Sequence, residues 1–91
     1  MVVFLTSLAA YQKMRATILT AQYSVWSASG ILTESESEAL YSAGIDLTIF
    51  NYEVDIHDEE LLEGALHTIR EHHGDIEIWL DNAQKCNLTE G

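Results

Sequence analysis

The stretch VVFLTSLAAYQKMRATI, residues 2–18, decides the fold class of this chain. Its first four residues, Val2–Leu5, form a continuous apolar run of β-forming side chains, which predicts a strand buried on both faces. Thr6 or Ser7 can then cap a helix, because the apolar residues from Leu8 to Ile18 recur at helical intervals. A buried strand followed directly by a helix is the repeating unit of parallel sheets.

The same alternation continues through the middle of the chain. Residues 23–28 favour a second strand, although Ser24, Ser27 and the adjacent Ser29 dilute the pattern. Thr33 and Glu36 form a capping box, in which each side chain can bond the backbone amide of the other residue. We expect the helix that they begin to run to Ala43 and to stop at Gly44, a usual left-handed terminator.

The last third supplies two more strands and one more helix. Residues 45–54 form the longest predicted strand, whose inward set changes parity between Ile49 and Phe50. Either a bulge reorients this strand or its far half is covered on both sides. Asp58 can cap a helix that runs through His72 or His73. In residues 76–81, Ile76, Ile78 and Leu80 then alternate with a mostly polar set that includes Trp79, which predicts a strand buried on one face only.

The predicted order is therefore β-α-β-α-β-α-β within a single small domain, residues 1–82, followed by a polar C-terminal tail, residues 83–91. This order favours an α/β fold with a four-stranded, largely parallel sheet and three helices; a two-layer mixed sheet is the alternative. Three helices are too few to cover both faces of a four-stranded sheet evenly. We therefore expect the half-buried last strand to lie at an edge.

Charge is the strongest functional signal in the sequence. Fifteen Asp and Glu residues face four Lys and Arg residues, the net charge is −11, and residues 16–69 contain neither Lys nor Arg. Such a surface repels nucleic acid and anionic membranes and attracts basic proteins. Charging all four histidines would change the net charge to −7, so association is expected to respond to mildly acidic pH.

Other composition signals predict the compartment. The lone cysteine, Cys86, forms no intramolecular disulfide, which favours a reducing, cytoplasmic compartment. The apolar N-terminal run lacks the basic residues of a signal peptide, and no segment reaches the length of a membrane span.

Few residues carry a pattern that predicts chemistry, and no catalytic or cofactor motif stands out. In parallel sheets ligands bind beyond the carboxyl ends of the strands. Asp55, Asp81 and Asn82 are the candidates there for a magnesium or small-ligand site, although no cation is expected nearby and acidic residues also serve as caps and turns. The loop of residues 27–30 lacks the glycines of a phosphate-binding loop.

A helix face offers a second metal candidate. Glu63, His67 and Glu71 recur every four residues, a spacing that suits either a metal site or simple ion pairs.

The acidic residues between positions 53 and 63 are the preferred partner-binding candidates. A second acidic helix start at residues 34–38 would join them in one negative rim if both helices begin at the same sheet edge. Trp79, on the mostly polar face of the last strand, is a candidate anchor unless the first helix folds over it and buries it. That strand's edge could also pair with a partner strand or with a second copy of the chain. The predicted partner-binding residues are Glu53, Asp55, Asp58, Glu59, Glu60, Glu63 and Trp79.

The sequence thus predicts a small acidic interaction module of the inhibitor, immunity-protein or nucleic-acid-mimic type, which binds a basic partner surface without a cofactor. The alternative is a metal-dependent or small-ligand-binding domain that uses the carboxylates at the strand ends. A domain that only assembles with itself is a third reading.

Overall fold

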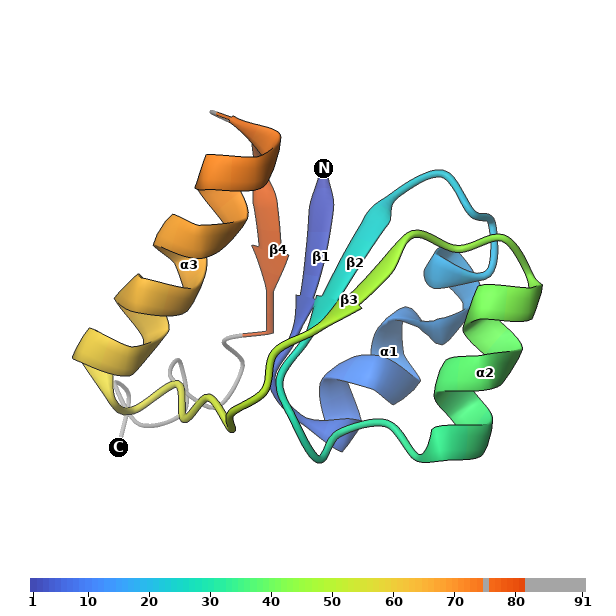
Figure 1. Cartoon of the computed structure of the whole chain (residues 1–91), viewed down its shortest axis with the longest axis horizontal. Helices are drawn as coiled ribbons and strands as arrows, with labels where there is room; N and C mark the ends of the chain where they lie inside the picture. Colours follow the sequence, from blue (N-terminus) through green and yellow to red (C-terminus); the bar gives the residue numbers. More distant parts are fainter. Residues whose placement is uncertain (75, 82–91) are drawn as a thin grey trace.

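The computed structural model describes residues 1–74 and 76–81 (Figure 1). Strands and helices alternate along this part of the chain, as predicted. The elements are β1 (Val2–Leu5), α1 (Leu8–Ile18), β2 (Ser24–Ser27), α2 (Glu34–Ser42), β3 (Leu47–Ile49), α3 (Glu59–His73) and β4 (Ile78–Leu80).

The four strands form one sheet in the order β3-β2-β1-β4, and every neighbouring pair is parallel. The second strand therefore forms despite its serines, and the parallel prediction is confirmed over the mixed alternative. In the register, Phe4 pairs with Trp26 on one side and with Leu80 on the other. As predicted, β4 lies at an edge.

Helices cover both faces of the sheet, with α1 and α2 on one side and α3 on the other (Figure 1). Alternate side chains of β1 enter two different cores, which is why all four of its residues are buried and its apolar run is unbroken. The α3-side core contains Val2, Phe4, Trp26, Ala28, Phe50, Val54, Leu62, Ala65 and Ile69. The core under α1 and α2 contains Val3, Leu5, Ala10, Tyr11, Ile18, Val25, Leu40, Ile45 and Leu47.

Each helix begins at the capping residue that its sequence predicts. The Ser7 hydroxyl accepts a hydrogen bond from the Ala10 amide at 3.1 Å. The Thr33 capping box is complete, with both reciprocal bonds formed. Asp58 accepts from the Leu61 amide at 3.2 Å. None of the helices in the described ranges has the length and apolar character needed to cross a bilayer.

The third strand is shorter than predicted. β3 ends at Ile49, and beyond it Phe50 and Val54 enter the α3-side core, whereas Asn51 and Glu53 are exposed, so this part of the chain is covered on one side only. The change of parity arises because Ile45 and Leu47 enter the core under α1 and α2, whereas Phe50 and Val54 enter the core on the opposite face. The inward prediction for Ile49 is wrong: its side chain is 40% exposed, since β3 is an edge strand and neither core extends over that position.

The last strand also differs from its prediction. β4 spans only Ile78–Leu80 and is partly buried on both faces rather than on one. Ile78 and Leu80 pack against the α3-side core, whereas Trp79 packs against the core under α1 and α2. Of the two expectations for Trp79, the structure favours burial under a helix, because this residue packs against the core under α1 and α2.

Candidate functional site: an acidic rim and a cavity at the strand ends

All three helices begin at the carboxyl edge of the sheet, because each one follows a parallel strand (Figure 1). The acidic first turns of α2 and α3 therefore lie along the same edge, on opposite faces of the sheet. The chain between β3 and α3 adds further carboxylates to this edge. We call the resulting group the acidic rim: Glu34, Glu36, Glu53, Asp55, Asp58, Glu59, Glu60 and Glu63.

Glu53 connects the two ends of the acidic rim. A methyl group placed on Gly30 would lie 3.7 Å from Glu53 Oε1, so this carboxylate reaches the loop that leads into α2. Gly30 itself has a φ of 82°, a conformation that disfavours other residues. The carboxylate of Glu53 thus stands between the acidic starts of α2 and α3.

The carboxylates of the acidic rim are not neutralised by lysine or arginine within residues 1–74 and 76–81. The ion pairs in those ranges are Lys13–Asp81 at 3.2 Å and His67–Glu71 at 3.4 Å, and neither involves the rim. Three rim residues have structural partners: the half-buried Glu36 accepts from the Thr33 amide in the capping box, Asp55 Oδ1 accepts from the His57 amide, and Asp58 caps α3. The other five rim side chains are exposed.

A cavity of about 270 Å³ opens at the same edge, between the ends of β1 and β4. The direction of strand addition reverses between these two strands, and such a switch point is where open α/β sheets bind ligands. The structure therefore brings together two of the predicted strand-end residues, Asp55 and Asp81; Asn82 lies outside the described residues. The lining residues are Thr6, Ser7, Ala9, Lys13, Asp55, Ile56, His57 and Asp81.

The expectation that no cation lies near the strand ends is wrong. Lys13, on the second turn of α1, extends to Asp81 Oδ1 at 3.2 Å, a contact between residues 68 positions apart in the sequence. This ammonium group lowers the negative charge that faces the cavity. Within the described ranges, no three His, Cys, Asp or Glu side chains are grouped so that they could hold a metal ion.

Two other predicted sites adopt simple local geometry. His67 Nε2 lies 3.4 Å from Glu71 Oε1, and both side chains are well exposed on the outer face of α3. Ser27 is fully buried and donates its hydroxyl proton to the carbonyl of Ala28, which takes this hydroxyl away from any ligand of the following loop.

Trp79 is not an exposed anchor. Its side chain is half-buried, because it packs against the core under α1 and α2. It forms no part of the acidic rim, since it lies within β4 rather than at a helix start. A role for Trp79 in partner binding stays a prediction.

One polar contact of the core could not be read from the sequence. The indole Nε1–H of Trp26 donates to His73 Nε2 at 2.9 Å, and the ring of His72 lies tilted against the same indole, with the ring centroids 5.3 Å apart. Only the position of α3 over β2 reveals the contact, because 47 residues separate the two partners.

No protein family, curated protein or solved structure matches this chain in comparisons with known proteins. The site must therefore be interpreted from its own geometry.

Proposed function

We propose that this protein is a small interaction module whose acidic rim binds a basic surface of a partner protein, as an inhibitor, immunity protein or nucleic-acid mimic does. Its proposed place of action is a reducing compartment such as the cytoplasm. The observation that carries the proposal is that the acidic starts of α2 and α3 share one edge of the sheet, with Glu53 between them.

Electrostatics supports this function in two ways. Carboxylates that project from one edge add their fields, which steers a basic partner and raises its association rate. The described structure places no lysine or arginine against the rim, so little of this field is lost internally. The same charge opposes binding to nucleic acid.

Two double variants of equal charge test the proposal. Glu53→Gln and Glu59→Gln together neutralise two rim residues, both exposed and neither a cap. The matched control neutralises Glu71 and Glu77, which are exposed away from the rim. Tagged protein captures its partner from a cell extract, and the partner is then purified and its affinity measured between 50 and 500 mM salt, roughly the range over which screening becomes strong.

The rim double variant is expected to weaken the purified complex at least tenfold, and the control double variant less than threefold. Affinity should fall steadily with salt. Equal loss in both variants would show that only the net charge matters, and a complex that is insensitive to salt would refute the electrostatic mechanism.

The cavity at the switch point favours a second candidate function, the binding of a small polar ligand. Hydroxyls of Thr6 and Ser7, the ammonium group of Lys13 and the carboxylates of Asp55 and Asp81 all line it. Such a mixture suits a ligand with groups of both charges, or a divalent cation bound together with an anion.

Thermal melting tests this candidate. Specific binding of Mg²⁺ should raise the melting temperature at millimolar metal, and Asp55→Asn should abolish the rise, because an amide keeps the bond to the His57 amide but loses the charge. An equal rise in Asp58→Asn, a rim residue outside the cavity lining, is the expected control result.

A further inference from the structure

The outer edge of β3 offers backbone hydrogen-bonding groups. The Asp46 carbonyl accepts from the Val25 amide, and the Phe50 amide donates to the Ser27 carbonyl, both at 2.8 Å. In a parallel pair of strands, the backbone groups of every second residue bond to the neighbouring strand. The N–H and C=O groups of residues 46, 48 and 50 therefore face β2. The N–H and C=O groups of Leu47 and Ile49 therefore point away from the sheet, toward the open edge.

The surroundings of this edge lack the usual means of blocking strand addition, apart from the shortness of β3. Natural edges are commonly protected by lysine, proline or a bulge. The whole chain contains no proline, and residues 16–69 contain no lysine or arginine. Two apolar side chains are exposed nearby instead: Ile49 on β3 is 40% exposed and Tyr41 on α2 is 53% exposed.

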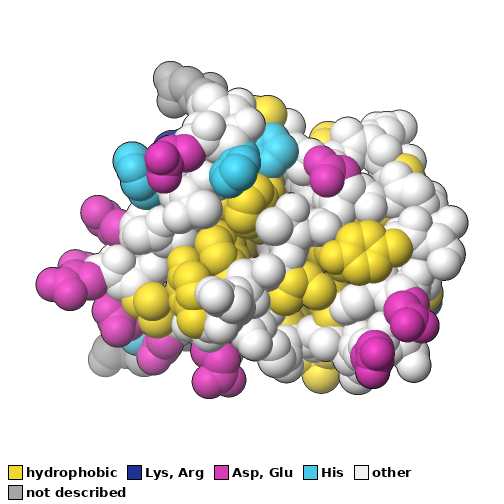
Figure 2. Space-filling model, viewed as in Figure 1, with side chains coloured by type: hydrophobic (Ala, Val, Ile, Leu, Met, Phe, Trp, Pro, Cys, Tyr) yellow, Lys and Arg dark blue, Asp and Glu magenta, His cyan; other side chains and the backbone are white. Residues whose placement is uncertain are grey.

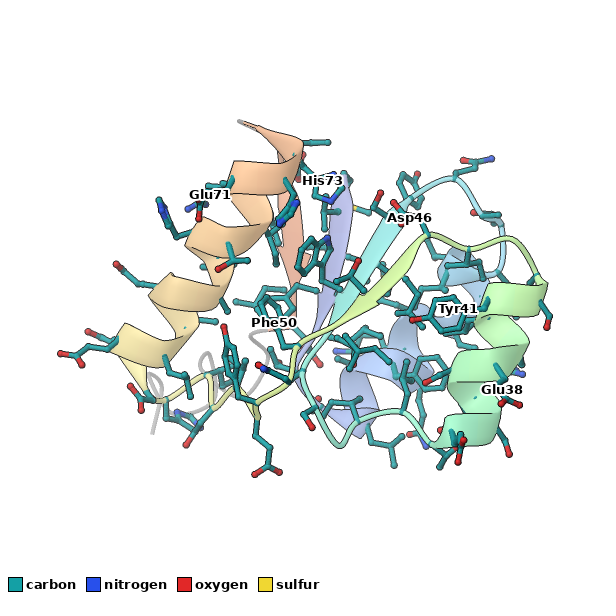
Figure 3. The ribbon with its side chains drawn as sticks, viewed as in Figure 1. Glu38, Tyr41, Asp46, Phe50, Glu71 and His73 are labelled. Carbon is teal, nitrogen blue, oxygen red and sulfur yellow. The ribbon has the colours of Figure 1, made fainter. Side chains whose placement is uncertain are left out.

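The face that contains β3 combines an apolar strip with acidic surroundings. Figure 2 shows hydrophobic side chains on both sides of β3 and Asp and Glu side chains around them, with Lys and Arg visible only as a small area near α3. Figure 3 places Tyr41 on the side of α2 that faces the viewer and Asp46 near the start of β3. Beyond the other end of the strand lies Glu53, a member of the acidic rim.

The acidic surroundings of the β3 edge determine which kind of partner can bind there. A second copy of the chain would bring the same net charge of −11 against the acidic surroundings, and like charges across an interface cost affinity. An extended segment with basic side chains has the complementary charge. Backbone pairing provides affinity in such strand addition, and alternate side chains provide specificity.

We propose that the edge of β3 binds an extended basic segment of a partner protein, which adds a fifth strand to the sheet. Its backbone bonds the outward groups of Leu47 and Ile49. An apolar side chain of the segment covers Ile49 and Tyr41, and lysine or arginine residues near its ends approach Asp46 and Glu53. This inference rests on the proposed function, since it specifies the form of the basic partner.

Defined peptides test strand addition. The probe is a capped nonapeptide of alternating lysine and valine, and the control is the same peptide with every backbone amide N-methylated, which keeps the charges but removes the donors. Binding is measured by titration into ¹⁵N-labelled protein, together with hydrogen exchange of the Leu47 and Ile49 amides. We expect the unmodified peptide to bind at least tenfold more tightly and to slow exchange at both amides at least tenfold.

Two substitutions in the protein provide an independent test. Ile49→Pro removes the outward-facing N–H without removing the bonds of residues 48 and 50 to β2, whereas Ile49→Thr keeps that N–H. Binding of the unmodified peptide should weaken at least tenfold in Ile49→Pro and less than threefold in Ile49→Thr. If Ile49→Pro does not fold, the exchange measurements on the wild-type protein still decide the question.

The outcomes separate this inference from the proposed function. Equal affinity for both peptides, with shifts only along the acidic rim, would overturn strand addition and leave the rim proposal standing. Strand pairing that is unaffected by salt would support strand addition and contradict the electrostatic function. Slow exchange at Leu47 and Ile49 without peptide, in a dimer detected by sedimentation, would show that a second copy occupies the edge and would overturn the inference.

Discussion

Trp26 donates its indole N–H to Nε2 of His73 at 2.9 Å and so links the center of the sheet to the last turn of α3. The indole can only donate, so Nε2 of His73 is the acceptor of this bond. Figure 3 shows His73 at the end of α3, pointing toward the sheet, while Glu71 points away from it. The single helix on this face is therefore joined to the sheet by a polar contact in addition to its apolar residues.

The Trp26–His73 hydrogen bond should contribute measurably to stability. His73→Phe removes the acceptor and leaves the N–H of the buried indole without this partner, so it should lower the free energy of unfolding by about 1 kcal/mol. His73→Gln, whose amide oxygen can accept from the same N–H, should cost less.

Urea unfolding provides the measurement. His57→Phe is the matched control, because His57 lies exposed in the loop before α3 and should change the free energy of unfolding by no more than about 0.5 kcal/mol. Equal losses in His73→Phe and His73→Gln would show that the hydrogen bond contributes nothing to stability.

The capping box of α2 should contribute measurably to stability. Thr33→Ala removes the hydroxyl that accepts from the Glu36 amide at 3.1 Å, and should lower the free energy of unfolding by about 1 kcal/mol. Ser35→Ala, in the exposed first turn of the same helix, should change it by no more than about 0.5 kcal/mol. Chemical denaturation compares the two, and equal effects would mean that helix propensity, not the cap, determines the change.

Neighbouring positions 49 and 50 should respond very differently to truncation. Phe50 is 7% exposed, and its ring packs between those of Phe4 and Trp26 at centroid distances of 5.7 and 5.3 Å. Phe50→Ala should therefore cost about 3–5 kcal/mol of unfolding free energy. Ile49→Ala, at an exposed edge position, should cost less than about 1 kcal/mol by the same denaturation measurement. A large loss at Ile49 would contradict the open edge.

Removal of the cavity's ammonium group should change its preference for cations. In Lys13→Met, Asp55 and Asp81 face the cavity without that nearby positive charge, so any melting-temperature rise caused by millimolar Mg²⁺ should become larger. Arg15→Met removes one charge from the exposed surface of the same helix and should leave the rise as in wild type. If both variants respond equally, the effect belongs to the net charge and not to the cavity.

The sequence predicted most of the architecture because its local signals agree with one another. The apolar run at Val2–Leu5 predicted burial on both faces, and the caps at Thr33 and Asp58 predicted where α2 and α3 begin. Parallel topology followed from the alternation of strands and helices. These features depend on periodicity and on residues that lie within four positions of each other.

Long-range relationships could not be predicted in the same way. The Lys13–Asp81 pair and the Trp26–His73 bond join residues 68 and 47 positions apart, and nothing in either local sequence indicates its partner. Strand ends were also overestimated, because an alternating pattern continues past the last paired residue of both β3 and β4. Likewise, nothing in the sequence indicates that α2 and α3 lie on opposite faces of the sheet.

The division of the helices between two faces has a consequence during synthesis on the ribosome. The segment up to β3 contains the elements that cover one face of the sheet, whereas the opposite face, with Phe4, Trp26 and Phe50, is covered only by α3, which is the last of the helices in the described residues to be made. At about 5–20 residues per second, that aromatic surface stays uncovered for roughly a second or more after β3 emerges. Chaperones that recognise nascent apolar surfaces have their target in this interval.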